Sequence, residues 1–151
     1  MPLNSDLPEL DETQFIYLVK GTILTLSFED GVQSGKGCYA HGSANLLEGI
    51  YKALLYKKEH QGSHFNAAVL MQSLSLRECL ELASDASIPL ENLKQLQRYL
   101  LHLYGFAQPV FSFSTQDLEI TPKVQEQHFF YKTELVKTMI YVSGFKPFRQ
   151  G

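Results

Sequence analysis

The residues best suited to chemistry gather in one glycine-rich stretch ahead of a predicted helix. Four glycines fall within twelve residues, one lysine lies among them, and an apolar pattern of helical spacing follows. Backbone amides in such a turn, together with the N-terminus of a helix, make a site for an anion. The candidate anion-binding residues are Gly35, Lys36, Gly37, Gly42 and Ser43. The preferred interpretation, however, is that the glycines form a structural turn that needs positive φ angles.

The same stretch lacks the spacing of a P-loop, which places four residues between its first glycine and a Gly-Lys pair and then a serine or threonine. Here three residues separate Gly31 from Gly35, and Gly37 follows the lysine. Cys38 and His41 are a weak catalytic candidate. A helix N-terminus lowers the pKa of a thiol, and a histidine can pair with the thiolate.

The remaining histidines do not suggest a metal site. His60 and His64 are four residues apart, but Gly62 interrupts any helix between them. The chain has no Cys-x-x-Cys and no His-Glu-x-x-His. His102 and His128 stand alone and are interpreted as ordinary surface or core histidines. No metal ligand is predicted.

Residues 75–104 also fit a helix-turn-helix, with 109–121 as a wing, and this gives a DNA-binding alternative. Arg77, Lys94 and Arg98 would meet phosphates, but acidic residues lie beside them and repel DNA. The formal net charge of -3 and the isoelectric point near 5.9 also disfavour a nucleic-acid partner. A solvated pair of helices is the preferred interpretation.

Composition indicates one domain in a reducing compartment. The 151 residues are 44% hydrophobic, which supplies enough apolar side chains for a full core. The first twelve residues do not resemble a secretory signal, and no apolar run approaches the ~20 residues that span a bilayer. Cys38 and Cys79 are expected to be free thiols, with one disulfide as the alternative. We therefore expect a cytoplasmic protein without a membrane partner.

Hydrophobic periodicity predicts strands and helices in mixed order. The segment 15–28 favours a strand because β-branched and aromatic residues alternate with polar ones, and a buried helix over 13–20 is the alternative. Segment 65–74 fits either state. Helices are predicted over 43–59, with Ser43 as N-cap, over 76–83, with Ser75 as N-cap, from Pro89 to near Gly105, and over 123–142. A strand over 110–114 and a loop over 115–121 separate the last two.

These elements predict an α/β (α+β) fold in which a small mixed sheet packs with three to four helices. Residues 1–12 read as a poorly ordered acidic lead-in, and 13–151 as a single α/β domain. The predicted core comprises Leu47, Ile50, Leu54, Leu93, Leu96, Leu100, Phe111, Phe113, Leu135 and Met139.

Two stretches resemble YcaO-domain proteins over roughly residues 31–122. The first is the Gly-rich turn at 35–43 with the helix that runs to His60, and the second runs from Leu90 to Pro122 through Thr115-Gln116-Asp117-Leu118-Glu119-Ile120. YcaO enzymes use ATP and magnesium to activate a peptide amide. In the alignment Tyr56 replaces a glutamate, which removes a carboxylate that would hold magnesium. His60 replaces an arginine and Glu119 replaces a glycine, which are further departures from the family pattern. The resemblance implies a truncated, degenerate relative.

The leading hypothesis is therefore a non-catalytic accessory domain that binds a protein or peptide, in a peptide-modifying system of the YcaO type, and carries no cofactor. The alternatives are an enzyme, either nucleotide-binding with ATP and magnesium or based on Cys38 and His41, and a winged-helix DNA-binding regulator. Aromatic residues near the end predict an interface or self-association, because Tyr and Phe anchor interfaces well. The candidates are Phe130, Tyr141, Phe145 and Phe148. The alternative is that these aromatic side chains only pack the last helix against the core.

Overall fold

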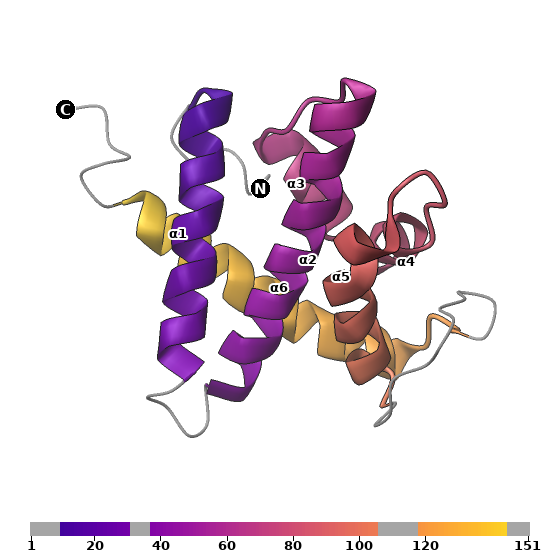
Figure 1. Cartoon of the computed structure of the whole chain (residues 1–151). Helices are drawn as coiled ribbons and strands as arrows, with labels where there is room; N and C mark the ends of the chain where they lie inside the picture. Colours follow the sequence, from indigo (N-terminus) through magenta and orange to yellow (C-terminus); the bar gives the residue numbers. More distant parts are fainter. Residues whose placement is uncertain (1–9, 31–36, 106–117, 145–151) are drawn as a thin grey trace.

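The computed structural model describes residues 10–30, 37–105 and 118–144, and every regular element among them is an α-helix (Figure 1). The helices are α1 (Glu12–Asp30), α2 (Gly37–Gln61), α3 (Ala67–Ser73), α4 (Leu76–Ala83), α5 (Leu90–Leu103) and α6 (Pro122–Ser143). The described residues contain no strand, so the predicted α/β fold with a mixed sheet is wrong. The strand predicted over 110–114 lies outside the described residues.

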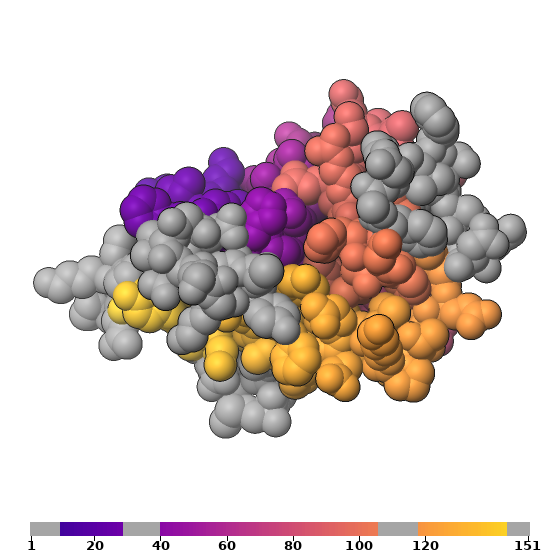
Figure 2. Space-filling view, turned by 90° about the horizontal axis from the view of Figure 1, so that it is seen from below, coloured from indigo at the N-terminus to yellow at the C-terminus, as the bar shows by residue number. Residues whose placement is uncertain are grey.

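Helix α2 is the centre of the arrangement. It packs against α1, α5 and α6, and α1 also packs against α6. Figure 1 shows α1 and α2 side by side, with α6 crossing behind them and α4 and α5 on the other side of α2. Seen from below, α6 runs across the face of the molecule with α5 beside it (Figure 2). Helices on several sides of α2 thus take the place of the expected sheet.

The segment that alternation assigned to a strand is helix α1. The hydroxyl of Thr22 donates to the carbonyl of Leu18 at 2.8 Å, and the hydroxyl of Thr25 donates to that of Gly21 at 2.9 Å. These bonds to the i−4 carbonyl let threonine hydroxyls be satisfied inside a helix. The alternating apolar residues also do not share one environment, because Leu26 is buried whereas Leu24 and Phe28 are exposed. The alternative helix over 13–20 matches the first half of α1.

The start of α1 is fixed by a reciprocal cap just after the predicted lead-in. The carboxylate of Asp11 accepts from the amide of Gln14 at 2.8 Å, and the amide of Asp11 donates to the Gln14 side chain at 3.1 Å. This is the geometry of a capping box. Of the lead-in, only residues 10–12 are described, and Glu12 already belongs to α1.

Helix α2 begins six residues earlier than predicted, and its N-terminal part includes Gly37, Gly42 and Ser43. These residues therefore do not form a turn, and Ser43 is not an N-cap. The two interior glycines lie where other helices come close. A Cβ atom on Gly42 would lie 2.2 Å from Cε1 of Tyr131, and one on Gly49 would lie 2.7 Å from the backbone of Leu96.

Capping residues place the later helices close to the predicted bounds. Ser75 accepts from the amide of Glu78 at 3.2 Å and starts α4, and Thr121 accepts from the amide of Val124 at 3.2 Å and starts α6. Pro89 immediately precedes α5. The predicted helices over 76–83, after Pro89 and over 123–142 are confirmed, and the ambiguous segment 65–74 contains α3.

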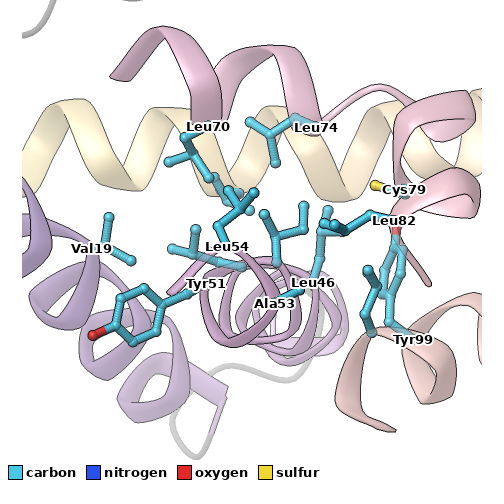
Figure 3. Close-up of a cluster of buried hydrophobic side chains, with 14 of the residues drawn as sticks. Val19, Leu46, Tyr51, Ala53, Leu54, Leu70, Leu74, Cys79, Leu82 and Tyr99 are labelled. Carbon is cyan, nitrogen blue, oxygen red and sulfur yellow. The ribbon is translucent and has the colours of Figure 1, made fainter. Parts of the chain in front are cut away.

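One main hydrophobic cluster joins all six described helices. Figure 3 shows Leu46, Ala53 and Leu54 of α2 in this cluster with Leu70, Leu74, Leu82 and Tyr99 around them. Eight of the ten predicted core residues are buried, namely Leu47, Ile50, Leu54, Leu93, Leu96, Leu100, Leu135 and Met139. The other two, Phe111 and Phe113, lie outside the described residues.

Candidate functional site

A buried polar cluster joins the α3–α4 connection, α5 and α6. Nε2 of His128 lies 2.6 Å from the carbonyl oxygen of Leu74, and its Nδ1 lies 2.7 Å from the hydroxyl of Tyr99. A carbonyl only accepts, so Nε2 carries the proton and donates to Leu74. Nδ1 is then the acceptor of the Tyr99 hydroxyl. Both ring nitrogens of His128 are therefore used in holding three elements together.

Burial controls the titration of this cluster. It lowers the pKa of His128, an effect that the hydrogen bond to Leu74 opposes and nearby Lys132 reinforces. It raises the pKa of Tyr99 and raises that of the neighbouring Cys79 thiol to about 12. The Cys79 thiol donates to the carbonyl of Ser73 at 3.3 Å. These groups are neutral near pH 7 and are arranged as structural partners rather than as a nucleophile with its base.

A cavity of about 300 Å³ opens beside His128, between the beginning of α4 and the first half of α6. Its polar lining includes Ser75, Arg77, Gln125 and Lys132 as well as His128. Its apolar lining is Leu76, Ile120 and Phe129. None of the described residues that line this cavity carries a carboxylate.

A second cavity of about 330 Å³ lies among α2, α3 and α4, with the opposite charge. Glu78, Glu81 and Asp85 line it together with one lysine, Lys57. Within the described residues, no group of three or more histidine, cysteine or acidic side chains is placed to hold a metal ion.

The predicted anion-binding residues are not brought together as a loop site. Gly42 and Ser43 are buried inside α2, and the hydroxyl of Ser43 donates to the backbone carbonyl of Tyr131 on α6 at 2.7 Å. Gly35 and Lys36 lie outside the described residues. The Gly-rich turn predicted over 35–43 is therefore wrong for its second half, where tight helix packing requires the small residues.

The predicted catalytic pair is placed only in part. His41 is exposed on α2, and the side chain of Cys38 lies outside the described part of the chain, so their pairing stays a prediction. At the far end of α2, where the YcaO resemblance implied the nucleotide site, Tyr56 and His60 stack with ring centroids 4.4 Å apart.

The helix-turn-helix alternative has its two helices in place. They are α4 and α5, which pack against each other. Arg77, Lys94 and Arg98 are exposed. The predicted wing is described only from residue 118, and residues 118–121 form no strand.

An exposed apolar stripe on α1 was missed from the sequence. Tyr17, Leu24 and Phe28 are 65%, 72% and 78% exposed, and their spacing of seven and four residues places them on one side of the helix. We call these three residues the α1 stripe. A helical period of about 3.6 residues would have placed these three side chains on one face. The segment was instead assigned to a strand, so this face was not recognised.

The predicted aromatic interface on α6 is partly described. Tyr141 is 62% exposed, and Phe130 is exposed near the middle of the helix. Val142, the neighbour of Tyr141, would meet a Cβ on Gly21 at an ordinary 3.5 Å, midway between Tyr17 and Leu24. Tyr141 therefore lies on the turn of α6 that packs against α1. Phe145 and Phe148 lie outside the described residues.

Comparison with protein-family models, with curated proteins and with solved structures found no match. The resemblance to YcaO domains is thereby neither supported nor refuted and stays a prediction. None of the described helices combines the length and the apolar character needed to cross a membrane.

Proposed function

We propose that the protein is a non-catalytic accessory domain that binds another protein through the α1 stripe and Tyr141. The observation that carries the proposal is the exposure of three large apolar side chains on one side of α1. The opposite side of the same helix buries Phe15, Leu18 and Val19 in the core. A surface helix ordinarily presents polar residues to water, and a row of exposed large apolar side chains opposite its buried face is typical of an interaction surface.

The area of this surface suits a protein interface. With aromatic side chains of about 150–250 Å² each, the α1 stripe and Tyr141 expose on the order of 500 Å² of largely apolar surface. This is near the upper end of the largest patch on ordinary monomers, about 300–600 Å². It would form the apolar centre of an interface that covers about 800 Å² per partner.

Charge at the edge of the surface indicates the chemistry of the partner. Lys20 is exposed on α1 between Tyr17 and Leu24, and Lys137 is exposed on α6 one turn before Tyr141. A partner segment with an apolar face and carboxylates at its margin would complement them. An amphipathic peptide segment of another protein has these properties. Its assignment to a YcaO-type peptide-modifying system rests on the sequence resemblance alone.

Paired charge insertions test the proposal. Leu24→Glu with Phe28→Glu places carboxylates in the α1 stripe, and Leu90→Glu inserts one at a matched exposed site on α5, where Leu90 is 65% exposed. Each protein is used as bait in the cells in which it occurs, and recovered proteins are quantified by mass spectrometry. The partner is then purified and titrated by calorimetry.

We expect a partner that binds the wild type and Leu90→Glu alike and binds the double variant at least about tenfold more weakly. Equal binding to all three baits would contradict the proposal. Sedimentation equilibrium of the wild type is run beside it. A dimer that the double variant loses would assign the surface to a second copy of the chain instead.

A further inference from the structure

We infer that the cavity beside His128 is a binding site for a small aromatic anion, a carboxylate or a phosphate monoester. The site is separate from the α1 stripe and lies between the beginning of α4 and the first half of α6. Its volume of about 300 Å³ is at the lower end of the range for small-molecule sites. That size suits a single ring with one charged group.

The charge of the cavity points to an anion. Arg77 and Lys132 both line it, and neither makes an ion pair with any of the residues that the structure describes. The nearest charged neighbour along α4, Glu78, lines the other cavity instead. The described lining thus carries two cations and no carboxylate, in a chain whose net charge is -3. Arginine and lysine are the side chains that bind carboxylates and phosphates most strongly.

Local backbone and side-chain donors add to these cations. Helix α4 begins at the cavity, where Leu76 and Arg77 occupy its first turn, and the first amides of a helix have no partner within it. The side-chain amide of Gln125 is a further donor in the lining. An anion in the cavity would therefore meet two charges and several neutral donors.

The walls determine the rest of the ligand. Phe129 lines the cavity and is 60% exposed, and its ring supplies an aromatic surface for a ligand ring. Leu76 and Ile120 extend the apolar lining. His128 holds its wall in place through its two hydrogen bonds, to Leu74 and Tyr99. A preformed wall of this kind reduces the ordering cost of binding.

The test is calorimetric titration of the full chain with phenyl phosphate, benzoate, inorganic phosphate and neutral benzyl alcohol. We expect saturable binding of one or both aromatic anions, binding at least about tenfold weaker for inorganic phosphate, and none for benzyl alcohol. The better of phenyl phosphate and benzoate identifies the head group. Equal affinity for benzyl alcohol, or no saturation by either anion below about 10 mM, would overturn the inference.

Matched variants locate the binding. Arg77→Gln and Lys132→Gln should each weaken binding of the preferred anion about five- to tenfold, because each removes a charge-assisted contact. Lys94→Gln removes the same charge from an exposed position on α5 outside the cavity and should leave the affinity unchanged. Circular dichroism is used to check that each of the three variants is folded. An equal loss in Lys94→Gln, or none in the two cavity variants, would refute this location for the site.

Discussion

Replacing Gly49 by alanine should destabilise the protein by about 1 kcal/mol, even though alanine is the better helix former. A Cβ atom there would lie 2.7 Å from both the amide nitrogen and the Cα of Leu96, well inside an ordinary contact of 3.4–4 Å. Backbone atoms cannot rotate away, so α2 and α5 must separate by about 0.7 Å or more. Overpacking of this kind costs about 1–3 kcal/mol, and the gain in helix propensity of about 1 kcal/mol offsets only part of it.

Gly21→Ala is the matched control. This glycine also lies inside a helix, but its Cβ would meet Val142 at 3.5 Å, an ordinary distance. Here the propensity gain stands alone, and the substitution should stabilise by about 0.5–1 kcal/mol. Urea unfolding of both variants, followed by circular dichroism, measures the two changes. If Gly49→Ala were neutral or stabilising, the close crossing of α2 and α5 would be refuted.

Three further outcomes are expected. Ser43→Ala loses the buried hydrogen bond to Tyr131 and should lower the free energy of unfolding by about 1 kcal/mol in urea; no change would mean that this contact is not made. Burial lowers the pKa of His128, so below about pH 6.5 the unfolded chain binds a proton that the folded chain does not, and stability falls as the pH drops toward the folded pKa. In His128→Gln, stability measured between pH 7.5 and 5 should fall less than in the wild type, and an equal fall would contradict this assignment. In a Cys38→Ser background, a disulfide reagent at pH 8 should label Cys79 only after unfolding, because the thiol is buried and burial raises its pKa to about 12; rapid labelling of the folded protein would show otherwise.

Local signals were sufficient for α4, α5 and α6, the described helices of the second half of the chain. Ser75 and Thr121 each lie one residue before a helix. In each case the side-chain hydroxyl accepts a hydrogen bond from the backbone amide three residues later, and a serine or threonine in this position is a strong local signal for the start of a helix. Tyr131, Leu135 and Met139 recur at helical spacing and are all buried. The same spacing places His128 on the buried side of α6, so the period could have identified it as a core residue before its partners were known.

The first half needed information that neighbouring residues do not contain. In α1 the threonines and β-branched residues gave a strand-like alternation, but packing on α2 and α6 favours the helix, and tertiary context overrides weak propensities. Gly42 was assigned to a turn and Gly49 to the interior of the predicted helix, whereas both glycines let Tyr131 and Leu96 approach α2. Ser43 donates its hydrogen bond to Tyr131, which is 88 residues later in the chain. The residues around Ser43 contain no information about such a distant partner.

The candidate sites were predictable to different degrees. Tyr141 and Phe130 were identified because aromatic residues were abundant near the end of the chain, and both are exposed. The α1 stripe was hidden by the wrong period. The cavity beside His128 draws on residues from 75 to 132, so it exists only once α4 and α6 pack together.

Hydroxyl-radical footprinting of the purified complex tests the central claim most directly, because it reports the solvent exposure of individual side chains. The proposed docking surface predicts that oxidation of Tyr17, Phe28 and Tyr141 falls severalfold when the partner binds, while oxidation of Phe129 on the opposite half of α6 stays the same. Unchanged oxidation of Tyr17 and Phe28 in a complex that is demonstrably formed would contradict the claim that α1 is where this protein binds its partner.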